Sequence, residues 1–178
     1  LDFTKWVKLV LGLAVALLLL FTGYVLRGDA TGSSAGIIAE NILLSIPLVG
    51  AWVNSLLFSI AESGMIRVYA NHLVGLGLLW LALSWDHVRR YPISIRKHYG
   101  FILGTLAVSI IWQAPMDPEK LGVFHIAGPW FFLGLQEALR YVHPFWAGVV
   151  FPASFLIALL LLNRPGEIGR YAQIFSLA

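Results

Sequence analysis

The sequence predicts an all-α membrane protein with four transmembrane helices and two interfacial helical loops on one face. Hydrophobic residues make up 59% of the 178 residues, and charged residues only 12%. An ordinary soluble domain carries roughly 25% charged residues, so a soluble fold of this size would be left with apolar surface that it cannot bury. Long uncharged runs and an uneven distribution of basic residues among the loops support the same fold class.

Four stretches have the length and composition of a membrane span, which needs about 20 predominantly apolar residues. They are residues 9–26, 68–85, 99–116 and 141–163. We expect a single membrane domain over residues 1–178, in direct contact with lipid.

A fifth uncharged stretch, residues 41–61, has Pro47 and Gly50 near its centre. Proline interrupts a helix, so this stretch is expected to form two short helices near the outer surface. Residues 121–136, which are apolar and aromatic, form the second interfacial loop. Residues 28–36 are rich in glycine and are expected to form a flexible loop.

Loop charges orient the four spans, because loops on the cytoplasmic side carry an excess of Lys and Arg. With four spans, the basic residues of one side outnumber those of the other, which predicts that both termini lie on the cytoplasmic-like side. The richer side holds Lys5, Lys8, Arg89, Arg90, Arg96, Lys97, Arg164 and Arg170, and the poorer side holds Arg27, Arg67, Lys120 and Arg140.

Composition also excludes several kinds of site. The chain has no cysteine, which rules out disulfides, thiolate zinc sites, iron–sulfur clusters and covalently attached haem within it. The net charge is only +3 and the basic residues form no basic face, so nucleic acid is not an expected partner.

Two histidines of the second predicted span are candidates for axial ligation of haem iron, with His72 near its outer end and His87 at its inner end. Fifteen residues place them roughly 22 Å apart along a helix and about 60° apart around it. A histidine at a helix end is also commonly an interfacial hydrogen-bonding residue, and both interpretations stay open.

Other residues fit the same hypothesis. Gly75 and Gly77 would give a haem a flat helix surface below His72, and Arg89 and Arg90 could pair with propionates beside His87. Three further histidines are expected outside the spans: His98 as a solvated residue of the inner loop, and His125 and His143 on the outer loop, against a ligand or water.

Several short motifs occur in a fixed order along the chain: Gly23-Tyr24-Val25-Leu26, Asn41, Ile46-Pro47, Gly50, Arg67 with His72, Gly128-Pro129-Trp130-Phe131-Phe132-Leu133, Leu139-Arg140 and Gly148-Val149. In this order they resemble cytochrome b of the cytochrome bc and bf complexes. Arg67 and His72, five residues apart, resemble the Arg and the haem-ligand His that open the fourth helix of that family. The part around residues 96–99 and after residue 163 is similar to subunit IV of the photosynthetic complex.

The resemblance implies a split, diverged cytochrome b that holds the third to sixth helices of the family, in an energy-transducing membrane. A second membrane chain would then supply the first two helices and share one or two b haems, with His72 and His87 as ligands. It also implies extrinsic redox subunits and quinone or menaquinone as a further ligand.

Departures from the family pattern leave alternatives open. The second ligand of the family lies fourteen residues after the first, where this chain has Asp86, and His87 is one place late. A local widening of the helix restores the register, or the inner haem is ligated from elsewhere or absent. Pro129 replaces the glutamate that accepts a proton from quinol in the family, which argues against quinol oxidation at the outer pocket and for quinone exchange near His87 and His98.

Two functions follow from these observations. The first is an electron-transfer subunit of a quinone-linked membrane oxidoreductase that carries electrons across the membrane through haem b. The second is a cofactor-free anchor for extrinsic redox subunits. A transporter or channel is less favoured, because no acidic or basic residue lies at the middle of a span.

Overall fold

The computed structural model describes residues 2–60, 62–91, 94–112, 115–117 and 128–164, and residues 166, 168, 169, 171 and 174. Every regular element of this part is helical. The elements are α1 (Phe3–Val25), α2 (Ala30–Leu44), α3 (Gly50–Leu57), α4 (Glu62–Ala70), the π-helix η1 (Asn71–Leu76), α5 (Gly77–Arg90), α6 (Ile95–Ile111), α7 (Leu133–Ala138), the π-helix η2 (Trp146–Val150) and α8 (Phe151–Leu161).

Two helices are long and apolar enough to cross a membrane. They are Phe3–Val25 and the continuous helix Gly64–Arg90, which joins α4, η1 and α5. The other two predicted spans correspond to shorter helices, α6 with 17 residues and the apolar helix Trp146–Leu161. The all-helical fold is therefore confirmed for the described residues, with two candidate membrane spans, while the arrangement with four spans stays a prediction.

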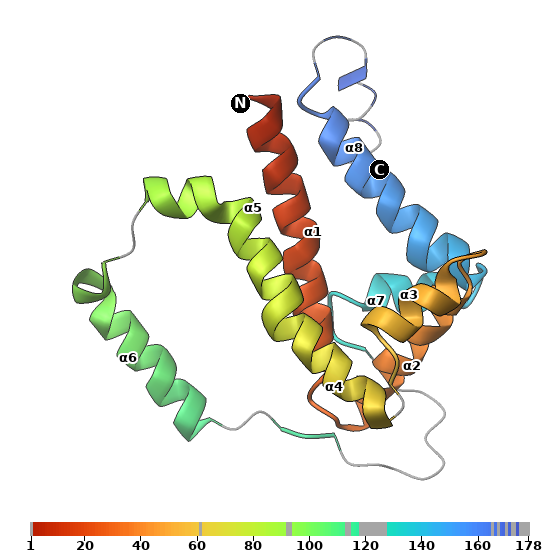
Figure 1. Ribbon diagram of the computed structural model, residues 1–178, viewed down its shortest axis with the longest axis horizontal. Coiled ribbons are helices and arrows are strands. Elements are labelled where there is room, and N and C mark those ends of the chain that lie inside the picture. Colours follow the sequence, from red (N-terminus) through yellow and green to blue (C-terminus); the bar gives the residue numbers. More distant parts are fainter. Residues whose placement is uncertain are drawn as a thin grey trace.

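The helices alternate in direction around α1. α5 and α8 run antiparallel to α1 on two sides of it, and α6 stands apart beyond α5 (Figure 1). The indole of Trp6 donates a hydrogen bond to the carbonyl of Leu159 at 2.8 Å, which ties the start of α1 to the end of α8.

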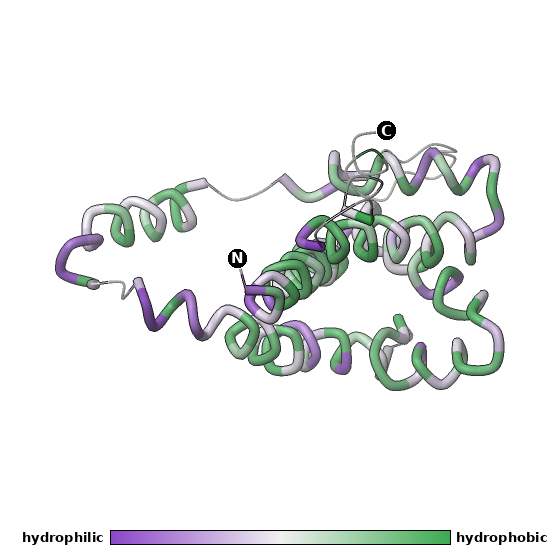
Figure 2. The backbone as a smooth tube through the Cα atoms, turned by 90° about the horizontal axis from the view of Figure 1, so that it is seen from above, coloured by the Kyte–Doolittle hydropathy of each residue, from purple (hydrophilic) through white to green (hydrophobic). Residues whose placement is uncertain are grey.

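One end of the molecule, which we call the packed end, contains the main hydrophobic core. It forms where the end of α1 meets α2, α3 and α4, and its buried residues are Val25, Ala35, Phe58 and Val68. Most large apolar side chains elsewhere on the helices are exposed, as a lipid-facing surface requires. Figure 2 shows how continuously hydrophobic residues follow the helices.

The glycine-rich segment 28–36 was expected to be a flexible loop, and this prediction is wrong. Most of it is the first half of α2, because the carboxylate of Asp29 caps the helix by accepting a hydrogen bond from the Gly32 amide at 2.9 Å. A side chain at Gly32 would meet the Tyr24 carbonyl at 2.8 Å. Glycine therefore serves here for close packing of α2 on the end of α1.

The break predicted around Pro47 is present. α2 ends at Leu44 and α3 begins at Gly50. Leu48 between them has a φ of 67°, a left-handed backbone conformation that non-glycine residues adopt mainly in tight turns. These two helices pack on each other beside the end of α1. The first is longer than the sequence predicted, because it already begins at Ala30.

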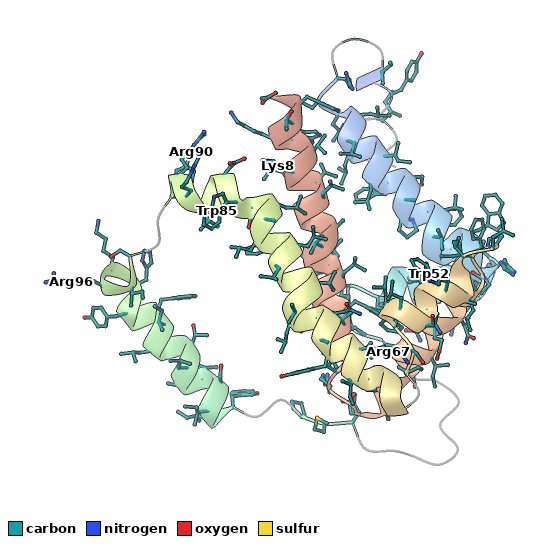
Figure 3. All side chains as sticks on the ribbon, in the orientation of Figure 1. Lys8, Trp52, Arg67, Trp85, Arg90 and Arg96 are labelled. Atoms are coloured by element: carbon teal, nitrogen blue, oxygen red, sulfur yellow. The ribbon has the colours of Figure 1, made fainter. Side chains whose placement is uncertain are left out.

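The opposite end, which we call the basic end, contains the start of α1 and the end of α5. Figure 3 shows Lys8 and Arg90 at this end, Arg67 at the packed end, and Arg96 apart from both at the start of α6. The guanidinium of Arg164 lies over the ring of Phe3, 4.0 Å from its centroid, which brings the segment after α8 to the same end. Basic residues that are far apart in the sequence, such as Lys8, Arg90 and Arg164, therefore lie at the same end of the molecule.

Candidate functional site

His72 lies in η1 and its ring faces α1. Its Nδ1 is 2.8 Å from the hydroxyl oxygen of Thr22. The same hydroxyl is 2.8 Å from the Leu18 carbonyl, one turn earlier in α1. A threonine hydroxyl has one proton, and the carbonyl can only accept it, so the network is satisfied when Nδ1 carries a proton and donates it to Thr22. This tautomer has its lone pair on Nε2.

Gly23 follows Thr22 and lets the histidine ring approach the helix. A β-carbon at Gly23 would lie 3.2 Å from Cε1 of His72 and 3.8 Å from Nε2. Contacts as short as the first are tight, so a larger residue would displace the ring. Thr22 and Gly23 together hold the imidazole in one orientation.

The helix between the two candidate histidines widens locally. Residues Asn71–Leu76 form a π-helix, in which hydrogen bonds join residues five apart. Such a turn accommodates one extra residue, so the fifteen residues from His72 to His87 rotate the helix by about as much as fourteen residues of a regular α-helix. The local widening left open by the sequence is present.

A cleft of about 600 Å³ lies beside His87 at the basic end, between the first half of α1 and the end of α5. Its deeper wall is apolar and includes Leu13, Ala16, Trp80 and Leu83. Gly12 also lines it, and a β-carbon there would meet nothing within 4 Å. The cleft is therefore open on the side of α1.

The mouth of the cleft is positively charged. Lys5, Lys8 and Arg90 line it together with a single acidic residue, Asp86. Lys8 and Asp86 form an ion pair at 2.6 Å, and both side chains are about 40% exposed, at 40% and 43%. Within the described residues, no ion pair involves Lys5 or Arg90, so the mouth has basic groups that could bind an anion.

His87 has a different environment from His72. Its side chain is exposed, and its ring lies beside Tyr91 with the centroids 5.0 Å apart. Of the two arginines predicted beside it, Arg90 lines the cleft, whereas Arg89 is exposed and does not.

The remaining sequence candidates lie elsewhere. Gly75 shares η1 with His72 but is exposed, and a β-carbon there would point toward the amide of Asn71. His98 is exposed in the first turn of α6, with Nδ1 2.8 Å from the Ser94 carbonyl. Nδ1 of His143 accepts a hydrogen bond from the Phe145 amide. His125 lies outside the described residues, and among those described no group of three acidic or histidine residues could hold a metal ion.

Beyond the packed end of α1, a buried carboxylate joins three segments. Asp29 pairs with Arg27 and accepts hydrogen bonds from the amides of Gly32 and Asp117, the second at 3.1 Å. Arg27 in turn donates to the Pro115 carbonyl at 2.9 Å. Burial raises the pKa of Asp29, but these hydrogen bonds and the Arg27 charge outweigh burial and lower it below the ordinary value of 3.8.

Aromatic side chains fill the space between α1 and the segment that begins at Gly128. Phe132 is buried and stacks on Phe21 with centroids 5.4 Å apart, and Phe131 meets the ring of Tyr24 edge-on at 6.1 Å. Phe21 also stacks on Phe58 of the segment after α3. The motif around Pro129 thus packs on the core of the packed end.

Thr22 beside His72 and Gly12 at the cleft were not predicted as site residues, and Gly23 was identified only as part of a family motif. One signal was present: Thr22-Gly23 interrupts an otherwise apolar run near the end of α1. The distance in sequence from Thr22 to His72, 50 residues, conceals their contact.

Comparison with known proteins identifies the family. Residues 3–112 match the family model described as cytochrome b(N-terminal)/b6/petB, a region that extends from α1 through α6 and includes both histidines and the cleft. Comparisons with curated proteins and with solved structures give no match. The matched region covers more than half of the chain, and the chain therefore belongs to the cytochrome b family, as a membrane electron-transfer subunit.

Proposed function

We propose that the chain is an electron-transfer subunit of a multi-subunit, quinone-linked oxidoreductase and holds b-type haem, with His72 as the axial ligand near the packed end. The observation that carries this proposal is the hydrogen bond between Nδ1 of His72 and Thr22. It leaves the lone pair of Nε2 for a metal, which is the arrangement that ligating histidines commonly have. Cytochrome b family members bind haem b, which supplies an iron that gains and loses one electron.

The residues around His87 fit a second haem at the basic end. Its cleft combines an apolar wall, open at Gly12, with basic groups at the mouth. An apolar macrocycle with two carboxylates has this same division, and Arg90 and Lys5 would pair with the carboxylates. The π-helix η1 supports the pairing of His87 with His72, because it restores the rotation expected for a spacing of fourteen.

Transfer across the membrane needs ligands at both ends and a fixed distance between them. The continuous helix Gly64–Arg90 supplies the distance, because both histidines belong to it. The chain's own residues would orient the His72 imidazole through Thr22 and pair with carboxylates at the mouth of the cleft. The proposal includes quinone exchange near His87 and His98, the residues that the sequence suggested for it.

A second membrane chain would complete the site. α6 makes few contacts with the rest of the described part, and its side chains are almost all exposed. Exposed apolar helices of membrane proteins can bind lipid or neighbouring helices, and the resemblance indicates that two helices come from a partner. Extrinsic redox subunits would bind the loops at the packed end.

A cofactor-free anchor is the second candidate. It is favoured by one observation, the ion pair between Lys8 and Asp86, because Asp86 occupies the position fourteen residues after His72 and already has a partner.

The experiment that separates these functions is a reduced-minus-oxidised visible spectrum of the purified complex, with haem b quantified per copy of this chain. We expect two b haems for the unmodified protein and the loss of one on His72→Ala. One haem that is lost on the same substitution would restrict ligation to His72 and assign His87 to the interface. No haem, or haem unaffected by His72→Ala, would contradict ligation by this chain and favour the anchor.

A further inference from the structure

Thr22 contacts the ring of His72, the haem ligand of the proposed function, and this contact bears on the reduction potential of that haem. We propose that Thr22 is a positioning residue, which fixes the tautomer and orientation of His72 and thereby sets the affinity and reduction potential of the haem on its Nε2. This inference rests on the proposed function, and it adds a residue on a different helix to the ligand itself.

The geometry suits the Thr22 hydroxyl as an acceptor from His72. Thr22 is buried, with 7% of its surface exposed. Its hydroxyl oxygen is 2.8 Å from the Leu18 carbonyl and 3.3 Å from the Leu19 carbonyl, so its single proton points back along α1. Its lone pairs then face His72 Nδ1, also at 2.8 Å. The helix thus holds the hydroxyl in an orientation in which its oxygen can accept a hydrogen bond from Nδ1–H of His72.

Acceptance of this hydrogen bond makes the imidazole a stronger ligand. A ring whose Nδ1–H is bonded to an acceptor donates more electron density from Nε2 and is held in one orientation. A more basic ligand favours the oxidised iron over the reduced iron, so the hydrogen bond lowers the reduction potential. Without it, the ring is free to rotate or to move its proton to Nε2, where the lone pair is needed.

Steric contact restricts the ring from the adjacent position. Gly23 allows Cε1 of His72 to approach α1, and any larger residue there would compete for that space. The hydroxyl of Thr22 therefore fixes the rotation of the His72 ring about its Cβ–Cγ bond, while Gly23 sets how closely the ring approaches α1. Of the two, only the hydroxyl distinguishes one ring nitrogen from the other.

The test uses the intact complex with three substitutions. Thr22→Val removes the hydroxyl and retains the size of the side chain, whereas Thr22→Ser retains the hydroxyl. Thr105→Val is the matched control, because Thr105 also donates to a carbonyl one turn earlier, that of Phe101 at 2.9 Å, but is exposed on α6 and has no hydrogen bond to a histidine among the described residues. Haem content and the reduction midpoint of each b haem are measured by spectroscopic redox titration.

We expect Thr22→Val to weaken haem binding at His72 by about 10- to 100-fold and to raise its midpoint potential. A tenfold selective loss for the oxidised form corresponds to about 59 mV for a one-electron couple. Thr22→Ser should retain both values near those of the unmodified complex, and Thr105→Val should change neither.

Three outcomes would overturn the proposal, and they differ in what else they contradict. If Thr22→Val binds haem with an unchanged potential while His72→Ala loses it, His72 is a ligand but Thr22 does not position it. If Thr22→Val and Thr22→Ser shift the potential equally, packing rather than the hydroxyl is responsible. If the unmodified complex has no haem at this site, the proposed function fails together with this inference.

Discussion

The two ends of the α1–α5 pair offer their histidines very different surroundings. At the packed end, His72 is held between a buried hydroxyl and a glycine of α1, next to a core of apolar side chains. At the basic end, His87 is exposed and borders a cleft of about 600 Å³. The same helix therefore presents one imidazole in a formed contact and the other beside open space.

The packed end fixes the orientation of a side chain, whereas the basic end offers space and charge for a ligand. At the packed end, contacts with Thr22 and Gly23 determine the orientation of the His72 ring. The basic end has room and charge but few contacts that fix a side chain. We infer that a group in the cleft would contribute more to the local structure than one on His72 would.

The largest expected effect comes from placing the same larger side chain at a glycine of each end and comparing the haem bound at His72. Gly23→Val places atoms against the ring of His72, whereas Gly12→Val adds them to open space. We expect the first to displace the ring, to abolish haem at His72 and to lower the free energy of unfolding by about 1–3 kcal/mol, as overpacking does.

Gly12→Val should leave the packed end intact and reduce haem only at the cleft. Haem content per chain and the midpoint of thermal unfolding in detergent would be measured for both variants. Equal effects of the two substitutions on haem at His72 would contradict the comparison, because the ends would then be coupled rather than distinct.

Asp29 gives the next largest expected effect, and it tests how firmly the packed end is held. Asp29→Ala removes a helix cap and leaves Arg27 and two amides without their acceptor. We expect the free energy of unfolding to fall by about 1–3 kcal/mol, which would appear as a lower thermal midpoint. Glu137→Ala is the control, since its ion pair with Arg140 is more than half exposed and contributes about 0–1 kcal/mol.

The stabilisation from Asp29 should also depend on pH. Its pKa in the folded chain lies below the ordinary value of 3.8, so its contribution is complete above pH 3.8 and is lost as pH falls through the lower folded value. The difference in thermal midpoint between the unmodified protein and Asp29→Asn should therefore be constant at neutral pH and narrow in acid. A difference that widened below pH 3.8 would show that the sign is wrong.

The sequence predicted those features of the fold that neighbouring residues determine, and missed those that contacts between distant residues determine. The break between α2 and α3 was predictable, because Pro47 and Gly50 act on their own neighbours. The helical start of α2 was missed because Gly32 and Gly36 argue against a helix locally, whereas close packing on α1 and Ile60 is what requires glycine there.

The candidate site shows the same limit. His72 and His87 stood out as polar residues in or beside an apolar span, but Thr22 is 50 residues away from the ring that it contacts. Gly12 had no distinguishing local feature, since its importance lies in the cleft that it opens. Resemblance to the family supplied the order of motifs, and the contacts between helices required the three-dimensional structure.

The smallest expected effect belongs to the ion pair at the basic end. Lys8 and Asp86 are 2.6 Å apart but remain about 40% exposed, at 40% and 43%, so solvent and salt screen their attraction. Asp86→Asn should lower the thermal midpoint less than Asp29→Ala does. The difference between Asp86→Asn and the unmodified protein should disappear at about 1 M salt, where the Debye length is about 3 Å.

The ion pair also restrains the cleft mouth, so Asp86→Asn should release Lys8 for an anionic ligand and leave haem at His72 unchanged. A salt-insensitive loss as large as that of Asp29→Ala would mean that the basic end is fixed by this pair, and His87 would then be as constrained as His72.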